Sequence, residues 1–261
     1  MITSQYLVGA LPLWVVYLLT VLLLLLALEG GYLLGAFFQK RWPDQSASDV
    51  NTMVAASLAF LGFLLAFIIG MAVSLFNERL HLVIDEANAI GTTYLRAGFV
   101  EEPIASESRQ LLREYVDQRL ALTEPGQFDK AIARSQQIQD ELWSRAEILA
   151  NDAPNPVTSL YISALNEMID IHTERTIIRF YVRIPRSVLL GVYMVAVLTM
   201  VLIGVQGSYS GKRNYLALIV MVLILSMVFL IIIDLDNPSR GLIQIPQKAL
   251  LDLQQQLRTQ P

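Results

Sequence analysis

The sequence contains no cysteine and only two histidines among its 261 residues. The absence of cysteine excludes disulfide bonds, thiolate catalysis and cysteine-ligated zinc or iron–sulfur sites. His81 and His172 lie far apart in the sequence, and neither has a second histidine at metal-ligand spacing. We interpret both histidines as packing or interface residues, and we expect no metal site and no cofactor.

Charge is also scarce, because Asp, Glu, Lys and Arg make up only 16% of the chain and the formal net charge is −4. This balance gives no broad cationic field, so nucleic acid is not an expected partner. The sequence has no G-x-S-x-G, no H-E-x-x-H and no phosphate-binding glycine loop. The adjacent acids Asp85 and Glu86 belong to different helix faces and are interpreted as solvated surface. We therefore expect that the protein is not an enzyme.

Apolar residues are abundant instead, at 54% of the chain. About 20 consecutive apolar residues are needed to cross the hydrocarbon core of a bilayer, and the sequence offers four such segments. They are 13–28, with a less clean extension to Phe38, then 53–76, 188–206 and 214–233. No Lys or Arg precedes the first segment, so we expect a retained span, not a signal peptide. The predicted fold is an all-α membrane protein with four transmembrane helices in a lipid bilayer.

An even number of spans puts both termini and the segment 77–186 on one side of the membrane. Four basic residues lie in the short connectors: Lys40, Arg41, Lys212 and Arg213. Seven lie near the membrane on the other side: Arg79, Arg175, Arg179, Arg183, Arg186, Arg240 and Lys248. The first span alone gives the opposite orientation, and long loops count weakly, but the larger set favours cytoplasmic termini.

The segment between spans two and three has the composition of a helical extramembrane domain. Neither glycine nor proline occurs between Met71 and Ile90, so the second span is predicted to continue as a helix into this domain. Ser106 is predicted to cap the following helix. The expected domains are 1–76 for spans one and two, 77–186 for the helical domain, 187–234 for spans three and four, and 235–261 for a C-terminal segment with a short amphipathic helix.

The second span carries an ordered pattern of small and bulky residues. Small residues at spacings of three or four form one stripe: Ala55, Ala59, Gly62, Ala66, Gly70 and Ser74. Phe63, Phe67 and Met71 recur every four residues and form a bulky ridge beside it. Plain helix–helix packing explains both rows, with the small residues allowing close approach. Alternatively, several copies place the ridge around an axis, where it forms an apolar constriction.

Three acids stand at or inside the spans. Glu29 follows a long apolar run, which is costly unless the carboxylate reaches the headgroup level or a partner on another helix. Asp234 and Asp236 follow the fourth span, where they oppose the helix dipole. They are expected to make a specific contact, for which Arg240 is a candidate partner.

The order of these parts resembles that of bestrophins, the pentameric anion channels. LGFLLAF followed by Asn77, Glu78 and Arg79 is similar to the second helix of bestrophins. More closely, DEANAIGTTYLRA at 85–97, LLREYVDQR at 111–119 and DLDNPSRGLIQIPQKALLDLQ at 234–254 resemble a mostly bacterial, functionally uncharacterised bestrophin-like family. The resemblance implies a homo-oligomer, with a pentamer favoured, in the bacterial inner membrane.

The resemblance to bestrophins also implies a pore lined by the second helix, with a neck of bulky apolar residues spaced by four. The matching positions are Phe63 and Phe67, with Ala59 or Met71 as the third. The resemblance then implies passive conduction of small anions such as chloride. Calcium takes about six to eight oxygen ligands, and the residues after Asp236 supply too few carboxylates for a calcium site of the eukaryotic type.

Two other functions fit the sequence. The protein could be a non-conducting scaffold or sensor that recruits a partner through its helical domain, with the small-residue stripe closing the central axis. A stator-type proton channel subunit also has four spans with a domain between the second and third. Glu29 lies in the wrong span to match that class readily.

Overall fold

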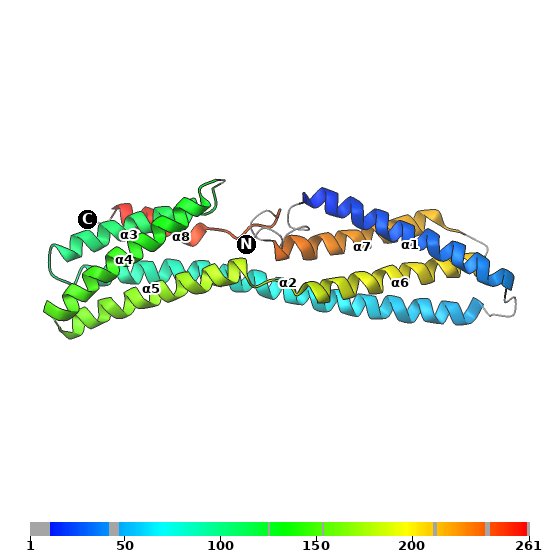
Figure 1. Cartoon of the computed structure of the whole chain (residues 1–261), viewed down its shortest axis with the longest axis horizontal. Helices are drawn as coiled ribbons and strands as arrows, with labels where there is room; N and C mark the ends of the chain where they lie inside the picture. Colours follow the sequence, from blue (N-terminus) through cyan, green and yellow to red (C-terminus); the bar gives the residue numbers. More distant parts are fainter. Residues whose placement is uncertain are drawn as a thin grey trace. The chain divides into compact units, whose positions relative to one another are not determined.

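The computed structural model describes residues 11–41, 47–124, 126–152, 154–210, 213–237 and 241–259. These residues form eight α-helices and no strand, which confirms the predicted all-α fold (Figure 1). The helices are α1 (Leu13–Arg41), α2 (Ala47–Ala97), α3 (Ile104–Ala121), α4 (Phe128–Asp152), α5 (Pro156–Phe180), α6 (Arg186–Ser210), α7 (Tyr215–Asp236) and α8 (Lys248–Thr259).

The chain forms two compact units, and α2 contributes to both. The first unit comprises Met1–Phe76 and Arg183–Ile243, and the second comprises Asn77–Val182 and Gln244–Pro261. At about 1.5 Å per residue, the 51 residues of α2 extend over about 76 Å, more than twice the ~30 Å thickness of the hydrocarbon core. The prediction that the second span continues as a helix beyond the membrane is therefore confirmed.

Four helices of the first unit are long and apolar enough to span a membrane: α1, α2, α6 and α7. Their shared core includes Leu24, Leu61 and Met200, each almost fully buried. Tyr193 stacks on Phe229 with ring centroids 4.0 Å apart, and its hydroxyl lies 3.0 Å from that of Thr20. The remaining apolar faces of these helices are exposed in the single chain, as expected for helices that face lipid or other subunits.

Glycines allow α1 and α6 to approach closely. A Cβ built at Gly31 would overlap the backbone of Val201, and one built at Gly204 would overlap the carbonyl oxygen of Leu28. Gly35 similarly faces Ser208. Gly31 and Gly35 form a G-x-x-x-G pattern, which is typical of closely packed membrane helices and was not among the predicted packing residues.

The second unit contains the later part of α2 with α3, α4, α5 and α8. Its core includes Ile90, Leu112, Leu142 and Leu165, and α8 adds Leu250 to it. These residues recur at helical spacing because each helix of this unit turns one apolar side to the core. The C-terminal segment thus has the short amphipathic helix that the sequence predicts.

Two helix starts illustrate how the local sequence sets boundaries. Asn155 caps α5, its side chain accepting a hydrogen bond from the Thr158 amide at 2.9 Å, with Pro156 at the first helical position. The prediction for α3 is wrong, because the helix already begins at Ile104 and Ser106 lies inside it. The Ser106 amide instead donates to the carboxylate of Glu102 at 3.1 Å, so a glutamate one turn earlier replaces the serine cap.

Candidate functional site

The membrane part of α2 has one side buried against its own chain. Its buried residues recur at spacings of seven, four, three and four: Val54, Leu61, Leu65, Ile68 and Ala72. At 100° per residue they lie within a narrow arc of the helix. The opposite arc of α2 is therefore left without a cover from the other three membrane helices.

The predicted ridge lies on this uncovered arc. The side chains of Phe63 and Phe67 are 68% and 61% exposed in the single chain. Ala59 is exposed as well, whereas Met71 is half-buried. Of the two candidates for a third ridge position, Ala59 is thus the more accessible and Met71 the bulkier.

The small-residue stripe occupies the same uncovered arc. All six of its residues are exposed: Ala55, Ala59, Gly62, Ala66, Gly70 and Ser74. A Cβ built at Gly62 or Gly70 would meet nothing within 4 Å. These residues therefore do not serve helix packing inside the described chain, and contact with another subunit stays a prediction.

The structure adds Phe60 to the ridge, a residue that the sequence analysis missed. Its side chain is 54% exposed. Phe60 lies seven residues before Phe67, which corresponds to nearly the same direction on a helix, and three residues before Phe63. Phe63, Phe67 and Met71 were predicted from their four-residue spacing. Phe60 does not share that spacing, but its separation of seven residues from Phe67 also places it on this side of the helix.

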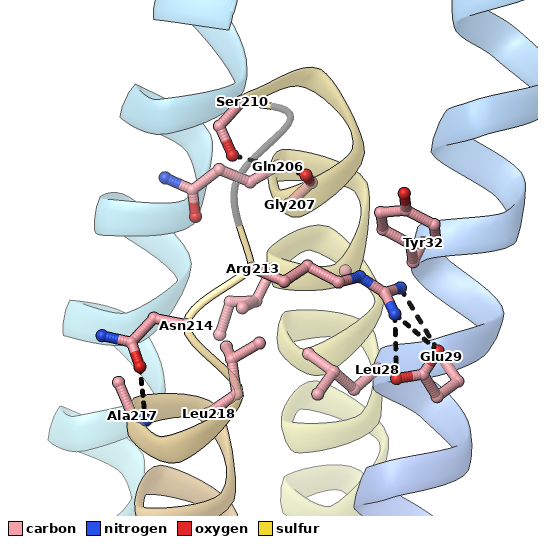
Figure 2. A pocket seen from close by; sticks show the side chains of 12 residues that line it. Leu28, Glu29, Tyr32, Gln206, Gly207, Ser210, Arg213, Asn214, Ala217 and Leu218 are labelled. Atoms are coloured by element: carbon pink, nitrogen blue, oxygen red, sulfur yellow. Dashed lines mark hydrogen bonds and ion pairs between the residues drawn. The ribbon is translucent and has the colours of Figure 1, made fainter.

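Glu29 has a partner on a neighbouring element. Its carboxylate pairs with Arg213, which precedes α7, at 3.2 Å (Figure 2). The Arg213 guanidinium stacks 3.2 Å from the centre of the Tyr32 ring and donates to the Tyr215 hydroxyl at 3.1 Å. The Glu29 side chain remains 51% exposed. Glu29 thus has a partner on another part of the chain, just before α7, and its position at headgroup level stays a prediction.

Asp234 and Asp236 bind backbone groups. Asp234 is buried and accepts hydrogen bonds from the amides of Leu242 and Ile243 at 2.7 and 3.1 Å. Asp236 accepts from the amide of Ile184 at 3.0 Å, and its carbonyl oxygen accepts from Arg183. Both acids therefore make specific contacts, as predicted, and their partners are backbone amides and the Arg183 side chain. Arg240, the candidate partner, lies outside the described residues.

A buried ionic cluster lies in the second unit, where sequence analysis expected only solvated surface. Glu86 is fully buried, so its interpretation as a solvated acid is wrong. Arg119 places its Nε 2.6 Å from Oε1 of Glu86, and Arg175 binds Oε2. Arg175 also donates to the side chain of Gln247 at 2.9 Å, just before α8. One carboxylate therefore connects α2, α3 and α5, and Arg175 extends the network to the C-terminal segment.

His172 completes this cluster. Its Nδ1 lies 2.9 Å from the Tyr115 hydroxyl and 4.0 Å from Glu86. Gln139 donates to the Tyr115 oxygen at 3.0 Å, which leaves the hydroxyl hydrogen for an unprotonated Nδ1. His81, in contrast, is exposed. Of the two histidines, His172 is thus the buried packing residue.

The burial and charges of the cluster fix its protonation states. Burial, helped by the guanidiniums of Arg119 and Arg175, lowers the pKa of His172 to about 4 against the opposing effect of Glu86. Burial would raise the pKa of Glu86, but the two arginines outweigh it and hold that pKa below its usual value. At neutral pH the cluster therefore contains a carboxylate, two guanidiniums and a neutral imidazole.

Comparison with solved structures places this fold among bacterial bestrophin homologues. The structure matches a bestrophin homologue from Klebsiella pneumoniae with a TM-score of 0.63 at 14% identity, covering 94% of this chain and 97% of that one. A point variant of the Klebsiella pneumoniae homologue matches with a TM-score of 0.61 at 14% identity, covering 94% of this chain and 99% of that one. At this identity the likeness shows the fold. Among curated proteins, none matches the sequence significantly.

The family is shown by the sequence itself. The model of the Bestrophin-like domain matches residues 21–250, which include most of α1, all of α2, α6 and α7, and nearly all of the helical domain. Its members have an ion-channel-type fold. The chain belongs to the bestrophin-like family.

Proposed function

We propose that the protein is a homo-oligomeric channel that conducts small anions such as chloride passively, through a pore lined by α2. The observation that carries this proposal is the uncovered aromatic row of Phe60, Phe63 and Phe67, each more than half exposed in the single chain. Large apolar side chains gathered on one face of a helix require a partner surface, lipid or a shared axis. Because the three rings point to the same side along α2, a position around a shared symmetry axis is favoured over contact with lipid.

The chemistry of this face suits a weakly binding anion path. The sequence has no ionisable residue between Asp49 and Glu78, so this stretch offers an ion no fixed counter-charge. Aromatic rings carry positive edges, which can face an anion that has shed part of its water. Stacked rings of phenylalanine would form a narrow apolar neck that also gates by dewetting.

Assembly follows from the same arc of α2. The exposed Gly62, Ala66 and Gly70 would let neighbouring α2 helices approach closely around the axis. A ring of five subunits is the assembly we propose, in the bacterial inner membrane, with the helical domain and both termini in the cytoplasm. The mass of the solubilised complex, measured by native mass spectrometry, tests the subunit number.

Ion flux into liposomes tests the conduction. Purified protein in liposomes should pass chloride or nitrate, and Phe67→Ala, which widens and wets the neck, should change the flux at least several-fold. The matched control is Leu26→Ala on α1, whose side chain is 62% exposed outside the α2 row. This variant should conduct as the parent does.

Absence of flux in repeated reconstitutions would overturn the channel proposal. The exposed small residues then favour the scaffold alternative, since they allow α2 helices to close the axis. Recovery of one stoichiometric soluble partner through the helical domain would support it. The third alternative, a stator-type proton channel, gains no support from Glu29, because this carboxylate is paired with Arg213.

A further inference from the structure

A pocket of about 150 Å³ lies between α1, α6 and the start of α7 (Figure 2), and its described lining does not include the aromatic row of α2. Its polar wall contains the Glu29–Arg213 ion pair together with Tyr32. Its apolar wall contains Leu28, Ile203 and Leu218. The lining therefore presents both a charged pair and a surface suited to hydrocarbon.

The pocket lies where the spans end. Ser210 is the last residue of α6, and Arg213 comes two residues before α7 begins at Tyr215. Tyr32 and Tyr215 flank the Arg213 guanidinium from two helices. Tyrosines concentrate at the level of lipid headgroups, where one end of the ring is apolar and the other is wet. The end of α6, the start of α7 and the two tyrosines thus favour a position at headgroup depth.

The ion pair is held in position and remains accessible. Arg213 is fixed by the Tyr32 ring, the Tyr215 hydroxyl and the carboxylate, which reduces the side-chain entropy lost on binding a ligand. Glu29 keeps half of its side chain exposed. Gly207 has no side chain to fill the pocket. The space beside it is open, because a Cβ built there would meet only Tyr32, at 3.8 Å.

We propose that this pocket binds the headgroup of a zwitterionic aminophospholipid such as phosphatidylethanolamine. The lipid ammonium would donate to Glu29, and the phosphate would accept from Arg213. A zwitterion matches the paired charges of the site, whereas an anionic headgroup would leave the Glu29 carboxylate repelled. The apolar wall would accept the first part of an acyl chain. This inference does not depend on conduction.

Native mass spectrometry of the full-length protein tests the site. The protein is equilibrated in detergent with phosphatidylethanolamine or with phosphatidylglycerol, and a parallel arm uses soluble phosphoethanolamine. We expect at least a several-fold excess of retained phosphatidylethanolamine, reduced to the phosphatidylglycerol level in Glu29→Gln and Arg213→Gln. Lys40→Gln, which removes an exposed cation at the end of α1, should retain the lipid as the parent does.

The arms separate the possible sources of the ligand. Retention of the intact lipid alone supports the bilayer as the source, while equal binding of free phosphoethanolamine would overturn the lipid assignment. A second variant, Gly207→Leu, fills the pocket without removing the ion pair and should also abolish retention. Unchanged lipid retention in this variant, or equal retention of both phospholipids by the parent, overturns the proposal.

Discussion

Arg119 and Glu86 form an ion pair with 2.6 Å between Nε and Oε1, and neither side chain is more than 1% exposed. Glu86 belongs to α2 and Arg119 to α3, while the second arginine of the cluster, Arg175, belongs to α5. A buried carboxylate without its cations would carry a large desolvation cost. The cluster therefore requires the three helices to be in place together.

Removing the buried carboxylate should destabilise the protein strongly. Glu86→Gln leaves two guanidiniums buried without a counter-charge, and breaking a buried pair in this way costs about 3–5 kcal/mol. Thermal unfolding of the solubilised protein measures the effect. The matched control is Glu114→Gln, which breaks the half-exposed pair with Arg134 and should cost less than about 1 kcal/mol. Equal losses in the two variants would contradict a special role for the buried cluster.

The same cluster predicts acid sensitivity through His172. The pKa of His172 is about 4 in the folded protein and near its ordinary value of 6.5 when unfolded. Between these values the unfolded chain binds a proton that the folded chain does not, so stability falls as pH drops from about 6.5 towards 4. Above 6.5 the imidazole is neutral in both states and contributes no pH dependence.

Thermal unfolding at a series of pH values checks this prediction. His172→Gln should flatten the decline between pH 6.5 and 4.5, whereas His81→Gln, at an exposed position, should leave the decline unchanged. Glu86 also titrates in acid, but its lowered pKa places that loss below its ordinary value of 4.5. A His172→Gln profile identical to that of the parent would show that another group controls the acid response.

The sequence predicted the spans and the continuity of α2 because these depend on local composition. Long apolar runs define a span by themselves, and the absence of glycine and proline after Met71 permits one helix. The uncovered arc of α2 also agrees with a local pattern, since the small residues and the phenylalanines occur at helical spacing. Its exposure in the single chain could not be derived, because it depends on which side the other spans cover.

The burial of Glu86 could not be predicted from the sequence. It lies next to exposed Asp85, and only the packing of α3 and α5 distinguishes the two acids. The count of basic residues used for orientation has the same weakness. Arg79 and Arg175 are buried, with Arg79 donating to the carbonyl oxygen of Val182 at 2.8 Å. These two charges serve the fold, which weakens their value as topological signals.

Adjacent glycines on α1 give a matched test of helix packing. A Cβ at Gly31 would overlap the backbone of α6, while a Cβ at Gly30 would meet nothing within 4 Å. Gly31→Ala should therefore destabilise the membrane unit by about 1–3 kcal/mol, as overpacked positions do. Gly30→Ala should be neutral or stabilising by up to about 1 kcal/mol, because alanine favours helix. The melting temperatures of the two variants measure the difference. A similar shift in both would contradict the close approach of α1 and α6 at Gly31.

Asp234 ties the segment from Gly241 to the end of α7, because its two carboxylate oxygens accept from the amides of Leu242 and Ile243. Asn is nearly the same size but offers only one acceptor oxygen, so Asp234→Asn would leave one partly buried amide facing an NH₂ group. The loss should be about 1 kcal/mol, the lower end of the cost of an unsatisfied donor, because the amides are only partly buried. It should appear as a lower melting temperature and faster proteolysis after residue 236. Asp252→Asn, at an exposed position on α8, provides the control, and equal behaviour of the two variants would show that the Asp234 contacts contribute little.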